Sequence, residues 1–187
     1  MIRSFLASIL TLGLLAGCSA TTERYVLEPS KSDLRLRISA ASVMVRSVSL
    51  PTYAAAEEIP VQGADGVIRA SAAGLWADDP ERAMTLVLAR QLNAMTTAVV
   101  APEPWPLDGV PDVAIDIRVE QMLATNTGML RLSGLYFIGG AGIEVAPNVR
   151  TFEIEAPVRG ESFGALATAQ SEALRLLAER ITRDLAR

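Results

Sequence analysis

Few side chains in this 187-residue sequence could do chemistry. It holds one cysteine, Cys18, and no histidine. Zinc sites built on cysteine and histidine are therefore excluded, as are nucleophiles that a histidine activates. A serine–lysine dyad would depend on Lys31, the only lysine. Paired carboxylates, which cleave glycosidic bonds, are the one familiar catalytic device that this composition leaves open.

Two groups of acidic residues are candidates for such a pair. Asp78, Asp79 and Glu81 lie at a typical helix start, where carboxylates cap backbone N–H groups and favour the helix dipole. Asp116 and Glu120 fall on one face of an expected strand, about 13 Å apart, which is too far for a shared site. We expect Asp78 to be the helix N-cap, and we expect no catalytic residue, no metal site and no enzyme activity.

Cys18 follows a segment typical of secretion. Arg3 and an apolar stretch over residues 5–15 have the layout of a signal peptide. This stretch is shorter than the roughly 20 apolar residues of a transmembrane helix. A disulfide within the chain would need a second cysteine. A free structural thiol is the remaining alternative, and it would not need the signal-like segment.

The run Leu15-Ala16-Gly17-Cys18 resembles the lipobox of bacterial lipoproteins. The resemblance implies cleavage between Gly17 and Cys18, and covalent diacylglycerol and N-acyl (palmitate-type) chains on Cys18; no other cofactor is expected. Residues 1–17 are then the signal peptide, 18–24 the lipidated cysteine with a short tether, and 25–187 the folded domain. In lipoproteins of this type an aspartate after the cysteine often signals retention in the inner membrane. This chain has Ser19 there, which favours the periplasmic face of the outer membrane, with inner-membrane retention as the alternative.

The composition fits one ordinary domain that binds no nucleic acid. Half of the residues are hydrophobic, the net charge is −4, and there is no basic run. The glycine-rich stretch 139–142 lacks the Gly-Lys-Ser/Thr ending of a phosphate-binding loop and is expected to be a turn.

Hydrophobic periodicity predicts the elements that would build the domain. Alternation predicts strands near residues 34–38, 113–119 and 151–156. Further strands are expected near residues 25–27, 43–50, 67–70 and 129–138, from β-rich composition or a preceding turn. One helix should start at Asp78, and an amphipathic helix should cover residues 163–185 and pack on the sheet. We therefore expect a single α/β domain with a mixed sheet of about five strands covered by helices.

Several segments together resemble the ABC-type transport auxiliary lipoproteins of the PqiC type. They are the lipobox, residues 25–27, Val48-Ser49-Leu50-Pro51-Thr52-Tyr53, Leu75-Trp76, the strand 113–119, and Ala156-Pro157-Val158-Arg159-Gly160. The resemblance implies a fold similar to the amino-terminal domain of TolB. It also implies a non-enzymatic subunit of a system that moves lipids between membranes, with an MCE-domain protein, a permease and an ATPase as partners and a homo-oligomer, such as a ring, as the assembly.

Leu50, Pro51, Tyr53 and Trp76 are the residues that we assign to a subunit or partner contact. Proline stiffens the loop, and aromatic side chains are enriched at interfaces. The alternative is that Tyr53 and Trp76 are partly buried anchors of their loops.

The sequence is compatible with two other functions. One is a lipoprotein scaffold in lipopolysaccharide or outer-membrane protein assembly. The other is a lipid-anchored hydrolase that uses only carboxylates.

Overall fold

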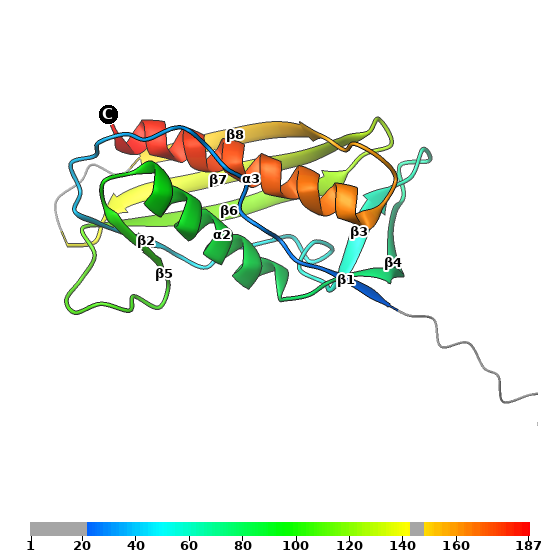
Figure 1. Cartoon of the computed structure of the whole chain (residues 1–187), viewed down its shortest axis with the longest axis horizontal. Helices are drawn as coiled ribbons and strands as arrows, with labels where there is room; N and C mark the ends of the chain where they lie inside the picture. Colours follow the sequence, from blue (N-terminus) through cyan, green and yellow to red (C-terminus); the bar gives the residue numbers. More distant parts are fainter. Residues whose placement is uncertain (1–21, 143–147) are drawn as a thin grey trace, which may run out of the picture.

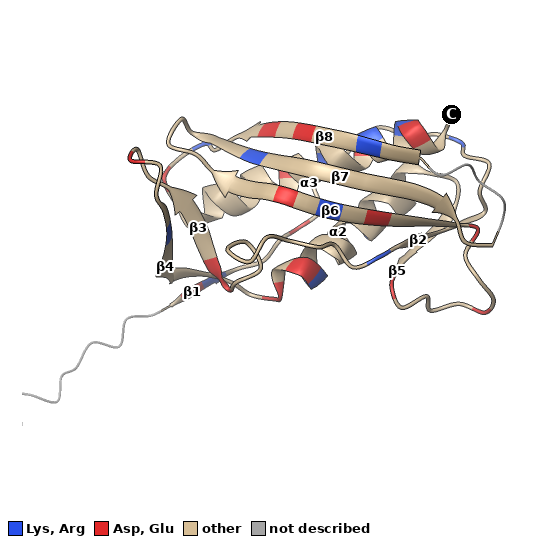
Figure 2. Cartoon of the chain, turned by 180° about the vertical axis from the view of Figure 1, so that it is seen from behind, with Lys and Arg blue, Asp and Glu red and all other residues tan. Residues whose placement is uncertain are grey.

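A computed structural model of the chain describes residues 22–142 and 148–187. In this part, two helices lie side by side on one face of a mixed sheet, and the other face carries no helix (Figures 1 and 2). The predicted signal peptide, Gly17 and Cys18 lie outside the described residues.

The elements follow one another in the order strands, helix, strands, helix, as the periodicity predicts. They are β1 (Glu23–Tyr25), β2 (Ser42–Val45), β3 (Glu58–Gln62), β4 (Ile68–Trp76), α2 (Pro80–Met95), β5 (Val99–Pro102), β6 (Val113–Ala124), β7 (Met129–Gly140), β8 (Asn148–Pro157) and α3 (Phe163–Leu185).

The sheet is arranged around β6, which runs along the long axis of the molecule (Figure 1). One edge of β6 pairs with antiparallel β7 along its whole length, and β7 pairs with β8. The other edge is divided: parallel β2 pairs with its beginning, and β3 pairs with its last residue. From there the sheet continues through β5 on one side and through β4 and β1 on the other.

The core lies between the sheet and the two helices. Alternate residues of β6 point into it, and so do the apolar stripes of both helices, as predicted. The fully buried side chains include Ile115, Ile117, Leu132, Tyr136, Met84, Leu88, Leu92, Leu174, Leu177 and Ile181. The Tyr136 hydroxyl donates a hydrogen bond to Asp184 of α3, and burial together with this bond raises the pKa of Tyr136.

The start of α2 differs from the prediction by one residue. Asp79, not Asp78, is the N-cap and accepts from the backbone N–H of Arg82 at 2.8 Å. The reason is Pro80, which occupies the first helical position because that position needs no N–H donor. Asp78 forms an ion pair with Arg82 instead.

The expected strand count of about five is too low, because the described residues form an eight-stranded sheet. One additional strand is β5, which has four residues and exists because β2 pairs with it. The strand expected to begin at Tyr25 ends there instead, as the three-residue β1. Such short segments carry too few residues for a periodic pattern. Conversely, the alternating residues 34–38 form only a single bridge, from Leu36 to Thr96 beyond the end of α2.

The β6–β7 hairpin contains an irregularity that requires a glycine. The register shifts between Val119 and Gln121, and Gly134 lies opposite this bulge. A Cβ atom at Gly134 would collide with the backbone carbonyl of Arg118, whereas one at Gly139 of the same strand would meet nothing within 4 Å.

Gly134→Ala should therefore destabilise the domain by roughly 1–3 kcal/mol, the usual cost of forcing extra atoms into a packed site. The free energy of unfolding, from urea denaturation followed by circular dichroism, measures this cost. Gly139→Ala is the matched control and should change stability little. Equal stability of the two variants would contradict this account of the bulge.

Candidate functional site

Residues 48–50, which lead into the predicted contact loop 50–53, are held between β6 and α2. Ser49 bonds to β6 on one side: its N–H donates to Ile117 at 3.0 Å, and its carbonyl accepts from Val119 at 2.9 Å. The neighbouring N–H groups point the other way, toward α2. Val48 donates to the Thr85 hydroxyl at 2.9 Å, and the Leu50 N–H donates to a Glu81 carboxylate oxygen at 3.0 Å.

The following residues form a tight turn that is also anchored. The N–H groups of Ala54 and Ala55 both donate to the Pro51 carbonyl, at 2.8 and 3.1 Å. The half-buried Tyr53 accepts a hydrogen bond from the backbone N–H of Met122 at 3.2 Å. Leu50, Pro51 and Tyr53 each keep part of their surface exposed, so this loop is a rigid and partly apolar feature of the surface.

Trp76 lies apart from this loop and inside the protein. Its side chain is 4 % exposed and belongs to a small cluster with Ile59, Ala124, Leu166 and Ala167. The ring is therefore an anchor between β4 and α3 and presents almost no surface in this structure. Contact of a partner with Leu50, Pro51, Tyr53 and Trp76 stays a prediction.

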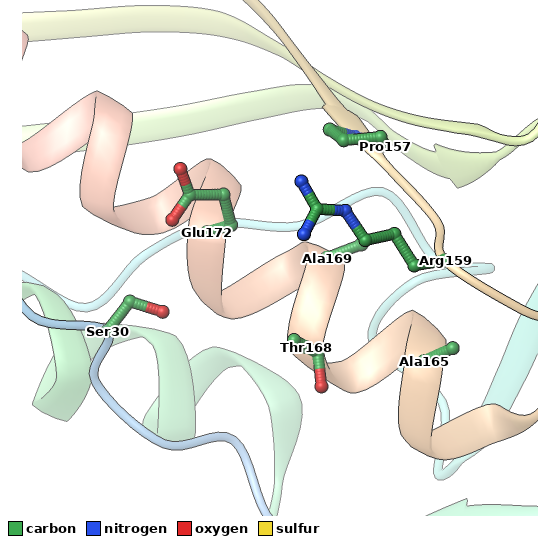
Figure 3. A pocket seen from close by; sticks show the side chains of 7 residues that line it. All are labelled: Ser30, Pro157, Arg159, Ala165, Thr168, Ala169 and Glu172. Carbon is green, nitrogen blue, oxygen red and sulfur yellow. The ribbon is translucent and has the colours of Figure 1, made fainter.

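A groove of about 400 Å³ runs beside α3 (Figure 3). Ser30 lines one side. Pro157 at the end of β8 and Arg159 after it line the other side, and the remaining lining residues belong to α3. Those residues are Ala165, Thr168, Ala169 and Glu172. Sequence patterns did not predict this groove, because its walls come from three segments far apart in the chain.

The charges in the groove do not suit acid–base catalysis. Arg175 bonds to Glu172 and lowers the pKa of its carboxyl group, and the charge of Arg159 lowers it further. A general acid near neutral pH needs a raised pKa instead. The Thr168 hydroxyl donates to the Gly164 carbonyl at 2.9 Å, which is an ordinary bond within a helix.

Most of the acidic residues that were candidates for a carboxylate pair have structural partners, and Glu120 is exposed. Asp79 caps α2, Glu81 accepts from Leu50, and Asp116 forms an ion pair with Arg118 at 3.0 Å. In residues 22–142 and 148–187, no group of acidic residues has the arrangement of a metal site. None of the helices in this part has the length and apolar character needed to span a membrane.

The described fold is shared with solved structures. One, titled as an uncharacterized protein, superposes with a TM-score of 0.70 at 18 % identity, over 88 % of this chain and 99 % of that chain. Another, from Xanthomonas campestris and assigned to family DUF330, has a TM-score of 0.63 at 14 % identity, over 86 % of this chain and 90 % of that chain. These similarities establish the class, an α/β domain with a mixed sheet and two helices.

The sequence identifies the family within this class. The profile described as "ABC-type transport auxiliary lipoprotein component" matches residues 25–182, and the chain belongs to this family. A comparison with curated proteins found no match. Family membership supports a membrane-anchored envelope protein associated with ABC-type transport.

The sequence did not predict that Thr85 and Glu81 of α2 hold the segment 48–50; Glu81 was assigned only to the helix start. The one signal for this role was a threonine among the apolar positions of α2. Thr85 is 3 % exposed, and its hydroxyl both accepts from Val48 and donates to the Glu81 carbonyl at 2.7 Å.

Thr85→Val should lower the free energy of unfolding by about 1–3 kcal/mol, because it leaves the Val48 N–H without an acceptor. Thr85→Ser keeps the hydroxyl and should lose clearly less. Urea denaturation of both variants tests this, and an equal loss would show that the hydrogen bond does not hold the loop.

Proposed function

We propose that this chain is a non-catalytic, lipid-anchored auxiliary subunit of an MCE/ABC-type system that moves lipids between membranes and supports envelope integrity. One observation carries the proposal: the match to the auxiliary lipoprotein family begins at residue 25, a short distance after a lipobox-like run that ends at Cys18.

The anchor in this proposal is the acylated Cys18 in the periplasmic face of the outer membrane. Several acyl chains give stable attachment, because each buried methylene contributes about 0.8 kcal/mol. β1 begins at Glu23 and so includes two residues of the expected tether. The five peptide steps from Cys18 to Glu23 span at most about 17 Å, so the domain would stay close to the membrane.

Partners would dock on surfaces that are rigid and partly apolar. The loop 50–53 meets this description. The end of the molecule that carries β5 and the loop after it also exposes apolar side chains (Figure 1). Val99, Leu107 and Val110, three large exposed hydrophobic side chains, belong to that end. An MCE-domain protein, the permease and ATPase behind it, and further copies of this chain are the proposed partners.

Replacing Cys18 by alanine should abolish incorporation of radiolabelled palmitate and release the protein from the membrane fraction. Ser19→Ala, next to it, is the control and should leave both unchanged. Palmitate incorporation in the Cys18→Ala variant would contradict the anchor.

Detergent extraction of the full-length, lipidated protein followed by affinity purification should recover an MCE-domain protein and its permease. Recovery of an outer-membrane β-barrel instead would favour the scaffold function, and a monomer without partners would contradict both.

Tyr53→Ala and Tyr53→Phe separate the two interpretations of the loop. Both remove the acceptor for the Met122 N–H, at a cost of about 1 kcal/mol, but only alanine removes the aromatic ring. A partner contact predicts that alanine lowers the recovery of partners well below that seen with phenylalanine. Equal recovery with both variants, despite a loss of stability, would leave Tyr53 as an anchor alone.

A further inference from the structure

The hairpin formed by β3 and β4 projects from the body of the protein. Only the last three residues of β4, Gly74–Trp76, pair with β1. The six preceding residues are exposed, and β3 is the only strand that pairs with them in the described part of the chain. The hairpin therefore extends beyond the region that the helices cover (Figure 1).

The tip of this hairpin exposes two large apolar side chains and carries no net charge. Val67 is 50 % exposed and Ile68 is 39 % exposed. Between Ile59 and Trp76 the only ionisable side chains are Asp65 and Arg69. These two pair with each other, with 2.9 Å between Arg69 Nη1 and Asp65 Oδ1.

The hairpin lies at the same end of the long axis as β1, and both views agree on this (Figures 1 and 2). β1 is the strand that follows the proposed tether. Because the tether reaches at most about 17 Å, the membrane that holds Cys18 would lie at this end of the molecule. β5 and its exposed Val99 lie at the other end.

We propose that the tip of the β3–β4 hairpin, residues 63–68, contacts the lipid surface in which the Cys18 acyl chains are inserted. This inference rests on the anchor in the proposed function. Val67 and Ile68 would enter the boundary between headgroups and acyl chains, where apolar side chains are stabilised. The exposed edge of β4 would stay at headgroup level, because unpaired backbone groups need water.

The hairpin contact would orient the anchored domain on the membrane. A lipidated cysteine on a short tether restricts distance but leaves the domain free to tilt. A second contact, at the tip of the β3–β4 hairpin, would fix the angle of the long axis relative to the membrane. The end with Val99, Leu107 and Val110 would then face away from the lipid, where a periplasmic partner could reach it.

Fluorescence quenching tests the contact on the full-length, lipidated protein. Val67→Cys, labelled with an environment-sensitive fluorophore, is reconstituted into vesicles of phosphatidylethanolamine and phosphatidylglycerol that carry lipids spin-labelled near the headgroup. Acylation leaves no free thiol on Cys18. Val99→Cys is the matched control, because Val99 is also a valine, is 52 % exposed and lies at the start of a strand, as Val67 lies just before one.

The label at position 67 should be quenched at least about threefold more strongly than the label at position 99, as expected for a depth of about 5–10 Å. Ile68→Cys is a second probe site and should behave like Val67→Cys. Equal and weak quenching of all three labels in protein that floats with the vesicles would overturn the hairpin contact and leave the anchor intact. Protein that does not float with the vesicles would overturn the anchor and this inference together.

If position 67 is unquenched by lipid but becomes protected when an extracted protein partner is added, the hairpin is a protein-docking edge. That result would also overturn the proposal.

Discussion

The two unlike edges of β6 are the constraint on which the rest of this structure depends. β7 fills one edge, while β2 and β3 share the two ends of the other, and the segment 46–49 bonds to the edge between them. Because backbone groups of a sheet need partners, this segment has to lie extended. The N–H groups of Arg46 and Ser49 donate to β6. Those of Val48 and Leu50 face α2 instead, where they donate to Thr85 and Glu81. The loop 50–53 is thus fixed by a strand and a helix from distant parts of the chain, and this rigidity suits recognition by a partner.

The length of β6 also gives the molecule two distinct ends. At one end lie β1 and the projecting β3–β4 hairpin; at the other lie β5 and the loop after it (Figure 2). Exposed apolar side chains occur at both ends. The proposed tether would distinguish the two ends, because only the end that carries β1 would be within reach of an acylated Cys18. This asymmetry supports a subunit that holds a membrane with one end and a partner with the other.

The sequence by itself determined the long elements and excluded several kinds of catalytic site. β6, β7, β8 and the helices were predictable because their apolar residues repeat with the period of a strand or a helix over ten or more positions. The absence of histidine and of a second cysteine excluded most catalytic devices from composition alone. The order of short motifs also pointed to the correct family.

Only the tertiary structure decided which short segments become strands and which surfaces remain open. β1 has three residues, and its strand character comes from pairing with β4, whereas the alternating residues 34–38 form only one bridge. Contacts with distant segments likewise decide that Trp76 is buried and that Val67 is exposed. They also let the Thr85 hydroxyl accept from Val48 while it donates to the Glu81 carbonyl. Local periodicity indicates which side of a helix or strand is apolar, but contacts between distant segments determine what covers that side.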